Sequence, residues 1–146
     1  MKTLYTAHAT SVEGRNGHAQ SDDGNLSVEL GTPGGTSKKT GKITNPEQLF
    51  ACGYAACFGS AIEAMAKKEN AAVRNVEVHS EVNLNLDDQG GYFLSAALNV
   101  VIPGVDAETA QKLVRLAHGI CPYSKATRGN IEVKLMVNSE PLKQAA

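Results

Sequence analysis

The chain has 146 residues, of which 42% are hydrophobic and 20% charged, and its formal net charge is −1. This length and composition are typical of one globular domain over residues 1–146, and the low charge and the absence of tryptophan argue against nucleic acid as a partner. We find neither an N-terminal apolar leader nor an apolar run of about 20 residues, so we expect a cytoplasmic protein with no membrane partner.

The first third of the sequence predicts short strands and turns. A strand is expected over residues 4–10, a turn over 14–17, and a second strand over 26–30, where apolar and polar residues alternate. Residues 31–41 are rich in glycine and include Pro33, which is typical of a loop.

A helix is predicted from Pro46 to about residue 70. Asn45 is a favourable N-cap, proline fits the first helical position, and Gln48 occupies the position of a capping-box partner. Polar residues are scarce between residues 49 and 62, so we expect the helix to be buried on nearly all sides. Its many small residues allow close approach of another backbone.

A hairpin, a second helix and a last strand follow. The hairpin pairs residues 76–86 with 92–102, and we expect its first strand to present one apolar face, made of Val76, Val78, Val82, Leu84 and Leu86. The helix is expected from a cap at Asp106 to about residue 119, with its end at Cys121-Pro122, and the strand over residues 131–137. This order of elements predicts an α+β fold.

Three cysteines are the candidates for chemistry, because a lasting structural disulfide is disfavoured in the cytoplasm. Cys57 lies on the apolar face of the first helix, and Cys52 lies about 140° away around the helix axis, where we expect a buried, inert thiol. Cys121 lies at a helix end, where a thiol can be accessible. Spacing alone leaves Cys57 and Cys121 open between packed and reactive roles.

No metal or cofactor site is predicted. The sequence contains no Cys-x-x-Cys pair, and its four histidines show no ligand spacing to one another. His118 lies three residues before Cys121, which is a weak signal for a metal site.

A reactive thiol in this helix would need a positive charge. The thiolate is the nucleophile, and burial alone raises a thiol pKa. Arg15 in the predicted turn is a candidate cation, and Glu47 is a candidate carboxylate to hold its guanidinium. The ordinary alternatives are a solvated turn arginine and an acid that interacts with the helix dipole.

Two long segments carry a family resemblance. They are Asn-Pro-Glu-Gln-Leu-Phe-Ala-Cys-Gly-Tyr-Ala-Ala-Cys-Phe at residues 45–58 and Cys-Pro-Tyr-Ser-Lys-Ala-Thr-Arg-Gly-Asn at residues 121–130. With them, the chain resembles the organic hydroperoxide resistance proteins of the osmotically inducible protein C superfamily over nearly its whole length. Residues 4–7 and the turn at 14–17 fit as well.

The resemblance implies a thiol-dependent peroxidase that reduces organic hydroperoxides to alcohols. It implies that Cys57 is peroxidatic, that Cys121 is the resolving thiol in an intrasubunit disulfide, and that Arg15 and Glu47 assist Cys57. Dihydrolipoyl groups of lipoylated proteins, or dihydrolipoamide, would be the reductant. The implied fold is an intertwined homodimer with antiparallel sheets wrapped around two central helices. At position 52, where this chain has cysteine, the family usually has alanine.

Helix geometry adds one prediction. Glu47 and Cys57 are ten residues apart on one predicted helix, or about 15 Å along its axis, which is too far for both to share one small site. We therefore predict that Arg15 and Glu47 reach Cys57 of the partner chain in the dimer.

Alternatives remain open at this point. The osmotically inducible protein C branch shares the chemistry but differs in substrate. A non-enzymatic dimer that binds an apolar ligand, and a redox sensor that passes oxidation to a partner, are the others. We expect Leu49, Phe50, Phe58 and Ile62 to line the site and to favour alkyl or lipid hydroperoxides.

Overall fold

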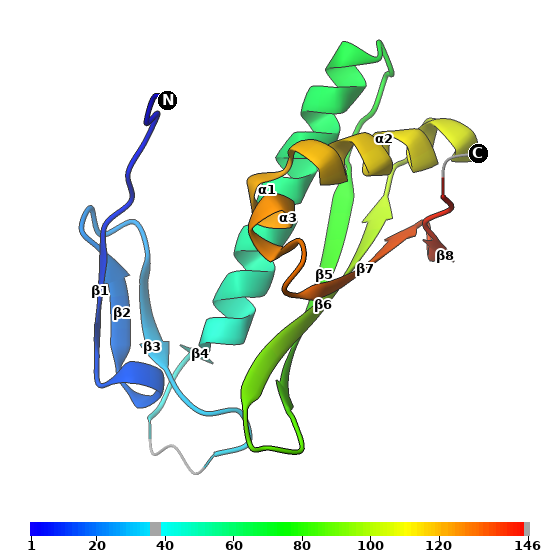
Figure 1. Cartoon of the computed structure of the whole chain (residues 1–146). Helices are drawn as coiled ribbons and strands as arrows, with labels where there is room; N and C mark the ends of the chain where they lie inside the picture. Colours follow the sequence, from blue (N-terminus) through cyan, green and yellow to red (C-terminus); the bar gives the residue numbers. More distant parts are fainter. Residues whose placement is uncertain (36–38, 145–146) are drawn as a thin grey trace. The chain divides into compact units, whose positions relative to one another are not determined.

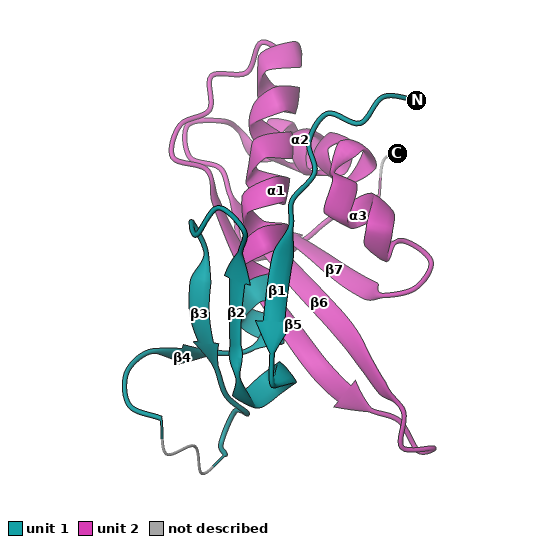
Figure 2. Ribbon diagram, turned by 90° about the vertical axis from the view of Figure 1, so that its left-hand side faces the viewer, with its two compact units in different colours: residues 1–49 teal, residues 50–146 magenta. Residues whose placement is uncertain are grey.

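The structure is a computed structural model that describes residues 1–35 and 39–144, so residues 36–38 of the expected loop lie outside the described part. The chain divides into two compact units, which Figure 2 shows in different colours. We call residues 1–49 the N-terminal unit and residues 50–146 the C-terminal unit. The expectation of one domain over residues 1–146 stays a prediction.

The N-terminal unit is built on a small four-stranded sheet. Its strand order is β1-β2-β3-β4, with antiparallel pairing among the first three strands and parallel pairing between the last two. The first pair of strands flanks a single turn of 3₁₀ helix, η1. The elements are β1 (Ala9–Val12), η1 (Gly14–Asn16), β2 (His18–Ser21), β3 (Ser27–Leu30) and β4 (Ile43–Thr44).

Three strands of this unit differ from the sequence prediction. The first begins at Ala9 rather than at residue 4, and neither β2 nor β4 was predicted. The β2 segment His-Ala-Gln-Ser has no alternation of apolar and polar residues, and it is a strand because β1 and β3 pair with it on either side. Pairing with the neighbouring strands therefore determines that the β2 segment is a strand.

Helix α1 (Pro46–Lys68) begins where its capping residues predict. The backbone N–H of Gln48 donates to Asn45 Oδ1 at 2.9 Å, so asparagine caps the helix. The Gln48 side chain does not complete a capping box, because its Oε1 accepts from Thr44 Oγ1 at 2.7 Å.

The prediction that α1 is buried on nearly all sides is wrong for the single chain. Tyr54, Phe58 and Ile62 are fully buried, whereas a stripe of small residues at Cys52, Ala56 and Ser60 is exposed. These positions recur every four residues, so they form one open face of the helix.

The apolar character of α1 also bears on the membrane expectation. Among the described residues, α1 is the one helix that could cross a bilayer by length and composition, so the expectation that the chain has no such run was too strict. Core helices pass the same test, and several α1 side chains belong to the hydrophobic core. This helix is therefore weak evidence for a membrane span.

The C-terminal unit combines helices with a second four-stranded sheet of order β5-β6-β7-β8 (Figure 1). The strands are β5 (Glu77–Leu86), β6 (Tyr92–Val101), β7 (Glu132–Val137) and β8 (Glu140–Pro141). β6 and β7 are parallel, and the other two pairs are antiparallel. The α+β prediction is thus confirmed, but both sheets are mixed rather than antiparallel.

The core lies on one face of this second sheet. Val78, Val100 and Val137 are opposite one another on β5, β6 and β7, and all three belong to the hydrophobic core or pack against it. Side chains of α1 and of α2 (Ala107–Ile120) cover this face, including Phe58 and Leu113. The helices therefore share one core with the sheet.

The far end of the β5–β6 hairpin lies outside this core. Leu84 and Leu86 follow the predicted face, yet both are exposed, as are Tyr92 and Phe93 on the returning strand. Leu84 and Leu86 lie on the strand face that the pattern predicted, but they are not part of the hydrophobic core of the C-terminal unit.

Two helix ends meet at Cys121. Asp106 caps α2 by accepting from the backbone N–H of Thr109 at 2.9 Å, as predicted. Cys121 ends α2 and begins the short helix α3 (Pro122–Thr127), with proline at its first position. The sequence predicted the end of α2 here but not α3.

Candidate active site

The turn that carries Arg15 depends on unusual backbone conformations. Glu13 and Gly14 have φ angles of 59° and 52°, in the left-handed region. Gly17 closes the turn, and an added Cβ there would overlap the carbonyl oxygen of Val12. These residues fold the chain back between β1 and β2, and the predicted turn is a single 3₁₀ turn at this point.

Arg15 and Glu47 form a two-pronged ion pair within the N-terminal unit. Arg15 Nη1 donates to Glu47 Oε2 at 2.9 Å, and Nη2 donates to Oε1. The Glu47 side chain is 13% exposed and that of Arg15 is 42% exposed. The Arg15 guanidinium holds the pKa of Glu47 below its usual range, mainly through these hydrogen bonds. The pairing of these two residues is therefore as the sequence predicted.

Lys39 connects the same turn to the sheet through hydrogen bonds. Its Nζ donates to the carbonyl oxygen of Gly17 at 2.7 Å, to Glu29 Oε2 at 2.9 Å and to the carbonyl oxygen of Leu30 at 3.3 Å. Lys39 thus joins the residue that closes the Arg15 turn to β3. No sequence pattern indicated this role.

Cys57 and Cys121 lie side by side within the C-terminal unit, although 64 positions separate them. Their sulfur atoms are 3.8 Å apart, with Cys121 Sγ placed to donate to Cys57 Sγ. Both are free thiols; Cys57 is half-buried and Cys121 is buried. A disulfide requires about 2.05 Å between the sulfur atoms, so a small movement would join them.

Aromatic rings belong to the same hydrophobic cluster as this pair or pack against it. Tyr123 stacks on Tyr54 with ring centroids 5.5 Å apart, and Phe50 meets both rings edge-on. Phe50 and Tyr123 are half-buried and can face an incoming molecule, whereas Phe58 is fully buried. Of the four residues expected to line the site, Phe58 and Ile62 are therefore core residues instead.

The surroundings of Cys57 do not by themselves favour its thiolate. Burial raises the pKa of Cys57, and the neighbouring Cys121 raises it further. The backbone N–H of Tyr123 donates toward the sulfur and opposes this shift. Burial and Cys121 together outweigh the effect of Tyr123, so the pKa of Cys57 lies above its usual value in the single chain. None of these three influences is a positive charge.

Cys52 is not the buried thiol that the helix pattern predicted. It is an exposed free cysteine, on the open face of α1 that also carries Ala56. The pattern failed here because it could not distinguish an apolar face that packs within the chain from one that does not.

Tyr54, Ser124 and Thr127 are the residues near the thiol pair that the sequence prediction missed. Their hydroxyl groups meet in the interior next to α3. The segment at residues 121–130 drew attention to position 124, but nothing in the sequence linked it to Tyr54, 70 residues earlier.

Metal chemistry finds no support in residues 1–35 and 39–144, where no group of three or more histidine, cysteine or carboxylate side chains lies together. His118, the weak candidate, is partly buried, and its pKa is lowered by burial and by the charge of Arg128. Arg128 also donates to the His118 carbonyl oxygen at 2.7 Å. This hydrogen bond joins the two ends of the segment 118–128.

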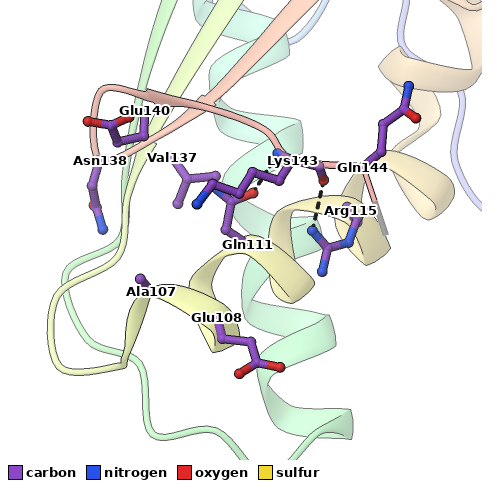
Figure 3. Close-up of a pocket in the computed structure, with 9 residues that line it drawn as sticks. All are labelled: Ala107, Glu108, Gln111, Arg115, Val137, Asn138, Glu140, Lys143 and Gln144. Carbon is purple, nitrogen blue, oxygen red and sulfur yellow. Dashed lines mark hydrogen bonds between the residues drawn. The ribbon is translucent and has the colours of Figure 1, made fainter. Parts of the chain in front are cut away.

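A separate cavity of about 500 Å³ lies between α2 and the strands that follow it (Figure 3). Gln111 and Arg115 border it, and both bond to the backbone of Lys143, at 2.9 and 3.0 Å. Neither Cys57 nor Cys121 lines this cavity, so it does not provide the entry to the thiol pair.

Known proteins similar to this chain share both its sequence and its fold. The family model of OsmC-like proteins matches residues 11–136. Organic hydroperoxide resistance protein OhrB of Bacillus subtilis is 49% identical over 134 residues, covering 90% of this chain and 96% of that protein. The organic hydroperoxide resistance protein of Xanthomonas axonopodis pv. citri is 46% identical, covering 92% and 94%.

Solved structures agree with these relatives. The crystal structure of Bacillus subtilis OhrB has a TM-score of 0.85 at 47% identity, covering 92% of this chain and 99% of that one. An organic hydroperoxide resistance protein from Elizabethkingia anophelis also has a TM-score of 0.85 at 47% identity, covering 94% and 98%. The chain therefore belongs to the organic hydroperoxide resistance proteins of the OsmC family.

Proposed function

We propose that this protein is a thiol-dependent peroxidase of the peroxiredoxin type, which reduces organic hydroperoxides with Cys57 as the attacking thiolate and Cys121 as the resolving thiol. The observation that carries the proposal is the 3.8 Å separation of the two sulfur atoms in a chain of this family. A half-exposed thiol backed by a buried one suits a nucleophile and its resolving partner.

The reaction proceeds in two steps. The Cys57 thiolate attacks the distal oxygen of the hydroperoxide, the O–O bond breaks, and the alkoxide takes a proton and leaves as an alcohol. Cys57 is then a sulfenic acid. The Cys121 thiol attacks this sulfur, the S–O bond breaks, and water leaves as the disulfide forms. The two electrons given to the peroxide come from the two thiols.

Recycling requires a dithiol. A dihydrolipoyl group attacks the disulfide, and its second thiol completes the exchange, which restores both cysteines and leaves the lipoyl group oxidised. Lipoylated proteins or dihydrolipoamide would supply this group, in the cytoplasm. Cys121 is fully buried, so we expect the dithiol to attack Cys57 first.

Arg15 supplies the missing positive charge. The thiolate of Cys57 needs an influence that opposes burial, and a guanidinium held by a carboxylate is suited to it. The positive charge of the guanidinium can also polarise the peroxide. Because Glu47 lies about 15 Å from Cys57 along α1, the pair acts on Cys57 of the partner chain.

A homodimer is part of the proposal. The open stripe of small residues on α1 permits close packing of a second helix, and the exposed end of the β5–β6 hairpin offers Leu84, Leu86 and Tyr92 as apolar contacts. A second copy of the chain that covers both surfaces would bury what one chain leaves exposed.

The central experiment compares the wild-type protein with Cys57→Ser and Cys121→Ser. Each protein receives cumene hydroperoxide with dihydrolipoamide, and peroxide consumption is measured. We expect no turnover from Cys57→Ser, and a single turnover without efficient recycling from Cys121→Ser. Full activity of Cys57→Ser would overturn the proposal, and wild-type oxidation without turnover would indicate a redox sensor instead.

A second experiment tests the contribution of the partner chain. Arg15→Met and Cys57→Ser chains are each expected to be inactive alone. Coexpressed, they form mixed dimers in which an intact Cys57 faces an intact Arg15 of the other chain. Random pairing should then restore about a quarter of wild-type activity. Absence of restoration in mixed dimers of confirmed composition would place Arg15 in the site of its own chain.

A further inference from the structure

The interior contact between α1 and α3 contains three hydroxyl groups. Tyr54 Oη lies 3.0 Å from Ser124 Oγ and 3.4 Å from Thr127 Oγ1. All three side chains are at most 2% exposed. Buried hydroxyl groups cost free energy unless they are bonded, so this cluster favours one arrangement of the two helices over others that would leave a hydroxyl unpaired.

The hydroxyl cluster continues into the backbone of α3. Thr127 Oγ1 donates to the carbonyl oxygens of Tyr123, at 3.0 Å, and Ser124, at 3.2 Å. Its single proton is thereby directed into α3, which leaves its lone pairs for Tyr54. The hydroxyl proton of Tyr54 can therefore go to either Thr127 or Ser124.

Helix α3 needs packing contacts of the kind that this hydroxyl cluster provides. It has six residues, and a helix this short is not stable without packing. Cys121 immediately precedes it and is fixed on one side by α2, where its N–H donates to the Ala117 carbonyl oxygen at 2.8 Å. On the other side its carbonyl oxygen accepts from Lys125 of α3 at 3.0 Å. The position of Cys121 therefore depends on α3 as well as on α2.

Tyr54 and the attacking sulfur of Cys57 lie on the same part of α1. Tyr54 is three residues before Cys57, so the two side chains are neighbours on the helix surface. The Tyr123 ring lies over Tyr54 and close to Gly53. The contact between α1 and α3 thus lies next to the place where Cys121 meets Cys57.

We propose that Tyr54 is a positioning residue for the resolving step: its buried hydroxyl, bonded to Ser124 and Thr127, fixes α3 on α1 and so keeps Cys121 within reach of the oxidised Cys57. The inference rests on the proposed peroxidase function and adds to it a residue that touches neither substrate nor sulfur. Tyr54 acts on the second step, and the attack on peroxide does not depend on its hydroxyl group.

The test uses Tyr54→Phe in the full-length protein, because phenylalanine keeps the stacked ring and removes only the hydroxyl. Tyr5→Phe removes a hydroxyl from an exposed tyrosine and is the matched control. Each protein receives one equivalent of cumene hydroperoxide, and samples are quenched over time. Dimedone labelling measures the sulfenic acid, and mass spectrometry measures the Cys57–Cys121 disulfide.

We expect peroxide consumption by Tyr54→Phe within about twofold of wild type, and disulfide formation slowed by about tenfold, as for the loss of one buried hydrogen bond. Sulfenic acid should accumulate, and excess peroxide should convert more of it to sulfinic acid. Tyr5→Phe should match wild type in both steps.

Two results would overturn the inference: unchanged disulfide formation in folded Tyr54→Phe, or an equal decrease in both steps, which indicates general loss of structure. Should Tyr54→Phe not fold, Ser124→Ala removes the other end of the same hydrogen bond and must show the same selective delay. A wild-type protein that forms neither sulfenic acid nor disulfide would instead refute the proposed function.

Discussion

Arg15 and Glu47 form a charged pair in the N-terminal unit, with the guanidinium partly open to solvent, whereas Cys57 and Cys121 form an uncharged pair among aromatic rings in the C-terminal unit. The first pair is held by hydrogen bonds between ions and by a turn with left-handed residues. The second is held by stacked rings and buried hydroxyl groups. The first pair supplies charge, which the thiol pair lacks, and the thiol pair has an apolar setting, which the ion pair lacks.

The difference explains how the thiol site is built. An apolar setting holds the two sulfur atoms close together, but burial raises the pKa of Cys57. A charged setting could lower that pKa, but it could not easily be buried next to the thiols in the same fold, because burying ions is costly. In the proposed homodimer, the ion pair of one chain would reach the thiols of the other only when the two chains associate, which would avoid this conflict.

The ion pair orients the Arg15 guanidinium more than it stabilises the fold. Partly exposed ion pairs contribute little to the free energy of unfolding. A two-pronged contact nevertheless fixes the plane of the guanidinium. We therefore expect changes in the N-terminal unit to alter the rate and changes around the thiols to alter both rate and stability.

Arg15→Met gives the largest expected effect. It should lower the rate of peroxide reduction by about 100-fold or more, as for the loss of a charge-stabilising donor. The pH midpoint for alkylation of Cys57 by iodoacetamide should rise, because no positive charge then opposes the effect of burial on the Cys57 pKa. Arg74→Met, at an exposed position, is the control. An alkylation profile of Arg15→Met identical to that of wild type would show that the two pairs are independent.

Gly53→Ala should have the next largest effect. The added Cβ would lie 2.5 Å from Tyr123 Oη, so the Tyr123 ring must shift against Tyr54, on which it stacks. We expect a loss of about 2 kcal/mol in the free energy of unfolding, measured by urea denaturation.

Gly59→Ala is the matched control on the same helix. Its Cβ would meet only Val78 Cγ2, at 3.7 Å, so the better helix propensity of alanine should stabilise the protein by up to about 1 kcal/mol. Equal effects of the two substitutions would mean that the Tyr123 contact does not hold α3 in place.

Glu47→Gln should lower the rate of peroxide reduction by about tenfold, because Arg15 keeps its charge but loses its ionic partner. The pKa of Glu47 is below its usual range, so its contribution to stability is present above the pKa of the unfolded chain and is lost as pH falls through the lower folded value. At pH 7 wild type should be more stable than Glu47→Gln by about 0.5 kcal/mol.

Thermal unfolding at a series of pH values checks this sign: the difference should begin to shrink as pH falls below the usual glutamate pKa of about 4.3 and vanish once pH lies below the lower folded value. Glu108→Gln is the control, since Glu108 also occupies the first turn of a helix. If both variants show the same pH dependence, the helix dipole and not Arg15 accounts for the effect.

The sequence was informative where the signals are local. The start of α1 at Pro46, the β5–β6 hairpin and the cap of α2 at Asp106 were all predicted, because caps, turns and alternating residues act over a few positions. The two family segments also directed attention to both members of the thiol pair and to Glu47.

The sequence was uninformative where distant segments decide the structure. β2 is a strand through its neighbours, and β7 lies parallel to β6 after two intervening helices. Helix α3 depends on Tyr54, and Lys39 on carbonyl groups of the Arg15 turn. The exposure of Cys52 could not be predicted either, because an apolar helix face can pack within one chain or between two.

Asp106→Ala has the smallest expected effect and separates stability from positioning. It removes the acceptor of the Thr109 N–H at the far end of α2 from Cys121, which should slightly lower the free energy of unfolding, since the helix loses its N-cap. Because Tyr54 and the hydroxyl cluster remain, the rate of Cys57–Cys121 disulfide formation should match wild type, as measured by quenched samples after one equivalent of peroxide. A disulfide rate that falls with stability in this variant would mean that the thiols are aligned by the whole C-terminal unit and not by the contact between α1 and α3.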